Sequence, residues 1–271
     1  MTLERRDPPF LLVVAGHDSS GSAGLDADLD AARGMDVATA LVATARSVQD
    51  AGGVRSVGAR EPRAWLAEAL AVPRPGALKL GLLPGADHIV AAAELVRALR
   101  ADAEILPVVL DPVLEASSGF VFLDAAARAA LRERLGPLGA IWTPNLPEAA
   151  ALTGRALSAL ESSPLARVEA AGDLLEAGAG GVVLKGGHAR QDTVCDLVVA
   201  PGREPLRIES RRRAGAVLGG SGCRHATALA AGLARGASLE AAARAAGALV
   251  RTRLDALRGG ALEGPSRGRR A

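Results

Sequence analysis

The alternation of short apolar runs with helical stretches is the feature that most constrains the fold of this chain. Such alternation is typical of βα units arranged around a mostly parallel sheet. The candidate strands are Phe10 to Ala15, Val37 to Ala43, Ala77 to Leu82, Ile105 to Leu110, Ala140 to Thr143, Gly181 to Leu184 and Val194 to Val199, with Leu206 to Ile208 as a further candidate. The candidate helices are Ala23 to Arg33, Pro62 to Leu70, Asp87 to Leu99, Asp124 to Leu135, Pro147 to Leu152, Leu165 to Ala177, Cys223 to Ala234 and Leu239 to Leu257. We therefore predict an α/β fold with a mostly parallel central sheet flanked by helices.

Length and charge limit the partners that the chain can have. The 271 residues, 49% of them hydrophobic, suffice for one globular domain, which we place at residues 1–258. Residues 259–271 lack apolar periodicity and are expected to form a flexible Gly/Arg-rich tail. A net charge of +2 demands no polyanionic partner, so we expect no nucleic-acid binding. No apolar run in the sequence is long enough to span a membrane, and two cysteines without CxxC spacing fit a reducing cytoplasm.

A glycine-rich segment with a cysteine, "GGSGCRHATALAAGLA" from Gly219, precedes one candidate helix. Glycine N–H groups can approach an anion closely, and the N-terminal end of a helix favours negative charge. The segment therefore predicts a phosphate-binding loop, although its order of residues is not that of a Walker A loop. Cys223 would lie in the first helical turn, where its pKa is expected to be lowered so that it can accept a proton from a neighbouring hydroxyl. The alternative is a tight turn with a small packing cysteine.

Residues whose side chains carry oxygen or ammonium groups follow three other candidate strands. They would lie at the edge of the sheet where parallel sheets bind ligands. Asp111 ends "VVLD", and Asn145 and Glu148 lie in "TPNLPEAAAL". Their oxygens suit Mg²⁺, but Asn145 and Glu148 also match a helix capping box. Lys185 follows "GGVVL" and can neutralise a triphosphate. Lys185 and Lys79 are the only lysines of the chain. Each is either retained because its position requires a compact ammonium group, or present by chance.

The first loop, "AGHDSSGSAGLDADLDAAR", consists of small and acidic residues after the first strand. It is suited to wrap a flat ligand, with Asp18, Asp26 and Asp28 as acceptors for its hydroxyl or amino groups. Asp26 and Asp28 also fit the first turns of a helix, where the helix dipole favours negative charge. Cys195 lies within an apolar strand and is interpreted as inert packing.

The order of these motifs resembles that of the hydroxymethylpyrimidine and phosphomethylpyrimidine kinases of thiamine synthesis, which belong to the ribokinase-like superfamily. The resemblance covers nearly the whole chain and is carried by "AGHDSSGSAGLDADL", "SVQDAGGV", "KLGLL", "VVLDPV", "TPNLPEAAALTG", "VVLKGGH" and "GSGC". It implies a ribokinase-like three-layer sandwich. It also implies ATP- and Mg²⁺-dependent phosphorylation of 4-amino-5-hydroxymethyl-2-methylpyrimidine and of its monophosphate. Because members of the family are often dimers, a homodimer is one expectation.

The resemblance also assigns roles to individual positions. It places the pyrimidine near Gly16, Ala23, Gln49, Leu82 and Val113, with Gln49 bonded to the ring edge. It places ATP and Mg²⁺ at Asp111, Asn145 and Lys185, with Glu148 toward the metal. It makes Gly220 and Gly222 the anion hole and Cys223 the base that deprotonates the hydroxymethyl group.

Several positions depart from the family pattern. Gly219 stands where histidine is usual, and Arg224 and His225 stand where small or apolar residues are usual. These two side chains would either help to hold the phosphate or crowd the acceptor. The remaining departures are Ser19, Ser22, Arg46 and Ser117, the last in place of a lysine. Two alternatives stay open: a pyridoxine or pyridoxal kinase, and a pyrimidine-binding protein that has lost catalysis.

Overall fold

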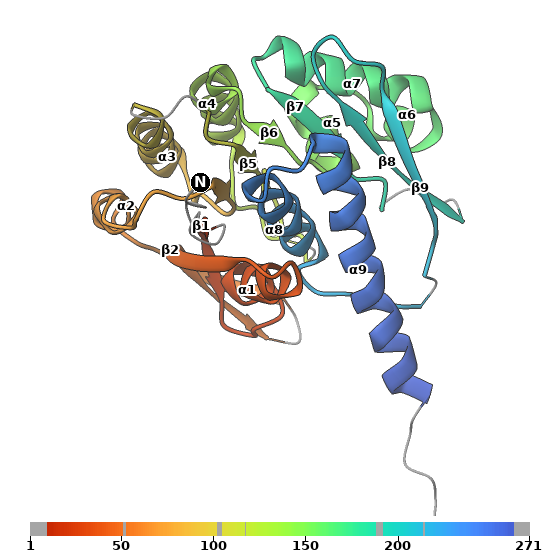
Figure 1. Cartoon of the computed structure of the whole chain (residues 1–271), viewed down its shortest axis with the longest axis horizontal. Coiled ribbons are helices and arrows are strands. Elements are labelled where there is room, and N and C mark those ends of the chain that lie inside the picture. Colours follow the sequence, from red (N-terminus) through yellow and green to blue (C-terminus); the bar gives the residue numbers. More distant parts are fainter. Residues whose placement is uncertain are drawn as a thin grey trace, which may run out of the picture.

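In the computed structural model, a nine-stranded sheet lies between two layers of helices (Figure 1). The structure describes residues 10–50, 53–101, 105–116, 118–187, 192–213 and 215–262, and the numbers of strands and helices refer to these residues. The strands are β1 (Phe10–Asp18), β2 (Ala38–Asp50), β3 (Gly53–Ala59), β4 (Ala77–Leu80), β5 (Val108–Leu110), β6 (Ile141–Trp142), β7 (Gly181–Leu184), β8 (Thr193–Val199) and β9 (Leu206–Arg211). Their order is β3-β2-β1-β4-β5-β6-β7-β8-β9. Neighbours from β2 to β7 are parallel, while β3, β8 and β9 pair antiparallel, which confirms the predicted fold class.

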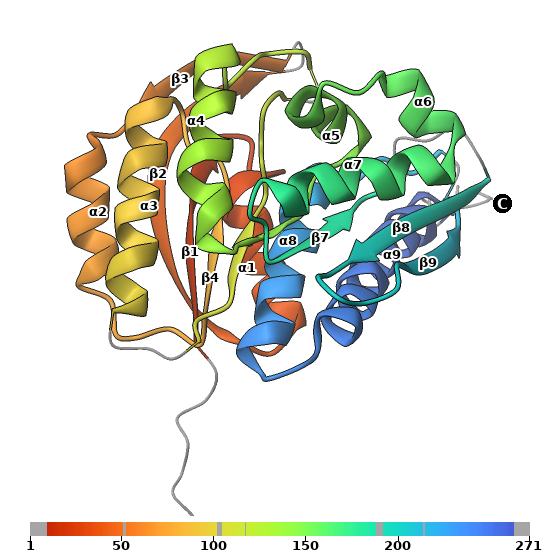
Figure 2. The same ribbon diagram turned by 90° about the horizontal axis from the view of Figure 1, so that it is seen from above.

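The helices cover both faces of the sheet (Figures 1 and 2). One layer contains α2 (Pro62–Leu70), α3 (Ala86–Arg100), α4 (Ala125–Leu135), α5 (Leu146–Thr153), α6 (Leu157–Ser162) and α7 (Pro164–Glu176), with a 3₁₀ turn (η1, Gly136–Leu138) after α4. The other layer contains α1 (Gly24–Gly34), α8 (Ser221–Ala234) and α9 (Leu239–Leu262). Because strand side chains alternate between faces, β1 contributes Leu12 and Val14 to one core and Leu11 and Val13 to the other. Both faces are thus apolar, as a covered parallel sheet requires.

Helix α8 packs closely on the centre of the sheet. Its inner face consists mainly of alanine, and Ala226, Ala228 and Ala230 are fully buried. Such small side chains allow the helix to approach β1, β4 and β5. The N-terminal end of α8 consequently lies at the edge where the parallel strands end.

Some predicted boundaries were wrong. Strand β2 continues to Asp50 and pairs with β3, a polar strand that has no apolar alternation to reveal it. Arg46 fits this longer strand because its side chain is exposed. Strand β5 begins only at Val108, and Ile105 is 85% exposed. Helix α6 was not predicted.

Other predictions concern residues at or beyond the limits of the described chain. Helix α9 continues to Leu262, past the domain end predicted at residue 258. The rest of the predicted tail, together with Ser117, lies outside the described residues. The domain boundary and the tail therefore stay predictions. None of the described helices is both long and apolar enough to cross a membrane.

Candidate active site

The carboxyl ends of the parallel strands bring Asp111, Lys185 and the start of α8 together. Asp111 directly follows β5 and Lys185 directly follows β7, and Lys185 Nζ lies 2.9 Å from Asp111 Oδ1. Gly222 in the first turn of α8 faces this pair, since a Cβ built on it would lie 3.1 Å from Lys185 Nζ and 3.9 Å from Asp111 Oδ2. The predicted phosphate loop and the predicted phosphate cation are therefore neighbours.

The loop before α8 has a backbone that only glycine accommodates well. Gly220 has φ 62°, and a Cβ there would lie 2.8 Å from Ala23 Cα. Its left-handed conformation turns the chain into a 14-residue helix whose first N–H groups have no intrahelical partner. This arrangement is suited to bind an anion.

Cys223 lies in this first turn, but its acidity differs from the prediction. The residue is half-buried, and desolvation of the thiol raises its pKa to about 12, although the nearby Lys79 ammonium and the Gly24 backbone N–H lower it. The expectation of a lowered pKa was wrong for the unliganded protein, because desolvation, together with the charges of Asp28 and Asp111, outweighs these two groups. The thiol is therefore protonated at neutral pH in the unliganded protein.

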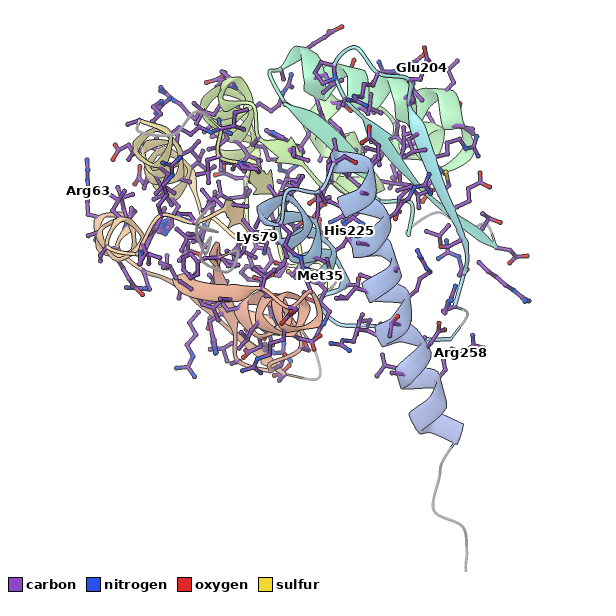
Figure 3. All side chains as sticks on the ribbon, in the orientation of Figure 1. Met35, Arg63, Lys79, Glu204, His225 and Arg258 are labelled. Carbon is purple, nitrogen blue, oxygen red and sulfur yellow. The ribbon has the colours of Figure 1, made fainter. Side chains whose placement is uncertain are left out.

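Lys79, for which the sequence left two interpretations open, lies in the layer between the sheet and α8 (Figure 3). It is 0% exposed, and its Nζ lies 2.8 and 3.0 Å from the two carboxylate oxygens of Asp28. Thr227 of α8 also donates to Asp28, at 2.7 Å. Burial alone would lower the pKa of Lys79, but the negative charges of Asp28 and Asp111 raise it. The lysine is thus a buried cation near Cys223.

This pair also corrects the interpretation of Asp28. We had expected Asp28 to be either an acceptor for the ligand or a charge favoured by the dipole at the start of a helix, whereas it is fully buried and bonded to Lys79 and Thr227. The only feature of the sequence that drew attention to Lys79 by itself was that the chain contains just two lysines. Its partner lies 51 positions away in the chain, and no local pattern connects the two.

Asn145 and Glu148 form the predicted capping box at the start of α5. Asn145 Oδ1 accepts from Glu148 N at 2.8 Å, and Glu148 Oε2 accepts from Asn145 N at 2.7 Å. Burial raises the pKa of Glu148 to about 7, against the influence of Lys185. Burial acts in the same direction on Asp111, but Lys185 and Lys79 hold the pKa of Asp111 below its usual value.

These groups fit Mg²⁺ only as part of a mixed ligand set. No group of three or more His, Cys, Asp or Glu side chains in the described part of the chain could hold a metal ion by itself. The Asn145 amide oxygen and one Glu148 oxygen are used in the capping box. Asp111 and Glu148 each keep a second oxygen, for which no hydrogen bond is recorded in the described residues, and Mg²⁺ commonly binds one or two carboxylates with phosphate and water as its other ligands.

The positions predicted for the pyrimidine mostly border the first loop. Gly16 packs on Leu82, since a Cβ on Gly16 would lie 2.7 Å from Leu82 Cδ2. Ala23 is the N-cap residue of α1, and Gln49 N donates to Ser19 Oγ at 3.1 Å. Val113 lies in the turn after Asp111 and is half-buried. Their contact with a ligand stays a prediction.

The Asp18 carboxylate is used by its own loop. It accepts hydrogen bonds from Ser20 N and Oγ, from Ser22 Oγ and from Ala23 N, at 2.7 to 3.1 Å. Burial would raise the pKa of Asp18, but these hydrogen bonds lower it. We had expected an acceptor for the ligand, whereas Asp18 shapes the loop around the site. The third acidic candidate, Asp26, is half-exposed and lies 3.6 Å from His17 Nε2.

Arg224 is engaged by the first loop and α1. Its Nε lies 2.8 Å from Asp30 Oδ2, and the same guanidinium donates to the carbonyl oxygens of Ser22 and Gly219. Arg253 of α9 shares Asp30, at 2.9 Å. These contacts tie the phosphate loop to α1 and α9, a structural role that we had not predicted for Arg224.

Comparison with known proteins is consistent with this geometry. A family model described as phosphomethylpyrimidine kinase matches residues 18–266. A hydroxymethylpyrimidine/phosphomethylpyrimidine kinase of Rhizobium meliloti is 36% identical over 90% of this chain and 90% of its own length. The corresponding protein of Bacillus subtilis is 34% identical over 89% of this chain and 87% of its own length.

Solved structures with a similar fold include enzymes for two different rings. Pyridoxal kinase from Staphylococcus aureus, in complex with pyridoxal, superposes with a TM-score of 0.81 at 27% identity over 92% of this chain and 89% of that chain. Phosphomethylpyrimidine kinase from Clostridium difficile superposes with a TM-score of 0.72 at 25% identity over 91% of this chain and 99% of that chain. The fold is thus shared by kinases of pyridoxal and of pyrimidines.

Proposed function

Because this chain belongs to the phosphomethylpyrimidine kinase family, we propose that it transfers the γ-phosphoryl group of ATP to 4-amino-5-hydroxymethyl-2-methylpyrimidine and then to the monophosphate. The observation that carries the proposal is the placement of Lys185 and Gly222 against each other, with Cys223 in the same helical turn. Phosphoryl transfer requires positioning and charge neutralisation more than covalent help, and these residues supply both.

Each residue has a part in the proposed reaction. Lys185 neutralises the phosphates, and the start of α8 binds the phosphoryl group that moves. Asp111 and Glu148 would hold Mg²⁺, which when bound neutralises charge on the phosphates. The first loop and Gln49 hold the pyrimidine with its hydroxymethyl group toward Cys223. The second phosphorylation uses the same groups, with a phosphate as acceptor.

Cys223 accepts the proton of the hydroxyl group, although its thiol is protonated in the unliganded protein. The thiol must therefore first release its own proton to solvent, and the groups that favour the thiolate are Lys79 and the Gly24 N–H. Because the transition state of phosphoryl transfer is loose, the hydroxyl proton can leave late in the reaction. A thiol that is ionised in only a small fraction of the molecules at neutral pH is compatible with that order.

The pyridoxal kinases among the structural neighbours support pyridoxal as the second candidate substrate. We favour the pyrimidine because the curated relatives that are 33–38% identical include hydroxymethylpyrimidine kinases and thiamine-synthesis proteins. Competition between the two substrates in one assay of ATP consumption separates them. Turnover of pyridoxal without turnover of the pyrimidine would contradict the proposal. Pyrimidine binding without ATP consumption would indicate a binding protein.

Gly222→Ala is expected to weaken ATP use without loss of stability. The added Cβ would lie 3.1 Å from Lys185 Nζ, in the space assigned to the phosphates, and Gly222 has no positive φ that would strain alanine. We expect kcat/KM for ATP to fall by about tenfold or more, since small displacements in such sites are costly. Gly232→Ala, on the same helix but packed on Ala242 of α9, is the contrasting variant, expected to lower the melting temperature instead. Unchanged ATP kinetics in Gly222→Ala would show that no phosphate lies against this turn.

A further inference from the structure

His225 is a buried polar residue that the proposed reaction does not yet use. It lies on α8 two positions after Cys223, is 4% exposed, and has no hydrogen-bond partner for either ring nitrogen among the described residues (Figure 3). A buried polar group without a partner destabilises the folded state, and such groups in native structures call for an explanation.

Asp196 of β8 connects His225 to the nucleotide side of the site. His225 Nε2 lies 3.9 Å from Asp196 Oδ2, just beyond hydrogen-bond distance. Asp196 Oδ1 accepts from Gly186 N at 2.8 Å, and Gly186 directly follows Lys185. A hydrogen bond from His225 would therefore link the helix that begins at the phosphate loop to the turn that carries Lys185.

Burial and four charged side chains from different parts of the fold determine the protonation of the His225 ring. Burial lowers the pKa of His225, and the cations Lys185, after β7, and Arg251, on α9, act in the same direction. Asp196 on β8 and Asp111 after β5 oppose them. The ring is therefore neutral at neutral pH in the unliganded protein. A polyphosphate beside Lys185 would offset the ammonium charge and favour the imidazolium.

We propose that His225 is a positioning residue that takes up a proton when a nucleoside triphosphate binds and then donates from Nε2 to Asp196. The proton comes from solvent, and the new contact fixes the spacing between the start of α8 and Lys185. This inference rests on the proposed function, because it requires ATP at the predicted place. It predicts opposite effects of removing the ring: the unliganded protein gains stability, whereas nucleotide binding weakens.

Calorimetric titration with Mg²⁺ and the non-hydrolysable analogue AMP-PCP tests the proton uptake. Titrations at one neutral pH in two buffers of different ionisation enthalpy give the number of protons bound with the nucleotide. The wild type is expected to take up a larger fraction of a proton than His225→Leu, and the variant is expected to bind about tenfold more weakly. His225→Gln keeps an N–H donor and should recover much of the affinity without recovering the proton.

His88 offers a matched control. It is 3% exposed, both of its ring nitrogens also have no recorded partner in the described chain, and it packs edge-on against Trp65 in the other helical layer. His88→Leu should leave both proton uptake and affinity as in the wild type. Equal uptake and affinity in the wild type, His225→Leu and His225→Gln would overturn the inference alone. Failure of the wild type to bind AMP-PCP would overturn the proposed function as well.

Discussion

Lys79→Met is expected to lower the free energy of unfolding by about 3–5 kcal/mol, because it leaves the Asp28 carboxylate buried without a counter-ion. Both side chains are fully buried, so water cannot replace the missing ammonium, and the Thr227 hydroxyl is the one other donor to Asp28 that the described residues record. Urea unfolding monitored by tryptophan fluorescence measures the change, since Trp65 and Trp142 are buried.

A second variant separates the charge from the packing. Lys79→Met combined with Asp28→Leu removes both charges, and we expect it to recover most of the loss, because a buried ion pair adds little net stability over apolar residues of similar size. Arg55→Met removes the exposed pair with Asp50 and should have no measurable effect. If Lys79→Met were as stable as the wild type, Lys79 and Asp28 would not form a charged pair.

Cys223→Ala is expected to lower kcat by about 10²- to 10⁴-fold, the usual contribution of a positioned base, while the affinity for the pyrimidine changes much less. The pH profile adds a second readout. Because the pKa of Cys223 is raised to about 12, the thiolate fraction grows as pH rises above neutral. Wild-type kcat should therefore increase with pH over the alkaline range in which the protein stays folded, and Cys223→Ala should lose this increase.

The second cysteine of the chain is the control for this experiment. Cys195 lies on β8, is half-buried and is also a free thiol. Cys195→Ala should keep the wild-type kcat and pH profile. Equal turnover in Cys223→Ala and the wild type would remove Cys223 from the proposed proton transfer.

Much of the fold could be predicted because burial on both faces makes the inner strands continuously apolar. β1 and β7 contain apolar runs that are followed by polar residues of the site, whereas β4 carries the buried Lys79. β3 could not be predicted in this way, since its residues are largely exposed and it is held by pairing with β2. Backbone pairing leaves no apolar pattern in a sequence.

The site was predictable where one short segment carries the interaction. The capping box of Asn145 and Glu148 was expected from the spacing alone and is present. Interactions between distant segments were not predictable: Arg224 meets Asp30, 194 positions away, and Lys79 meets Asp28. The pKa of Cys223 was predicted in the wrong direction because desolvation depends on everything packed around the thiol, and a local motif does not contain that information.

Product analysis of a single reaction tests the proposed function most directly. Purified protein is incubated with ATP, Mg²⁺ and 4-amino-5-hydroxymethyl-2-methylpyrimidine, and the pyrimidine products are separated by ion-exchange chromatography. Cys223→Ala and a mixture without enzyme serve as controls. The proposed function predicts that the monophosphate appears first and the diphosphate after it, with one ADP released per phosphate transferred. Unchanged pyrimidine at high enzyme concentration, from protein that is folded and binds ATP, would contradict it.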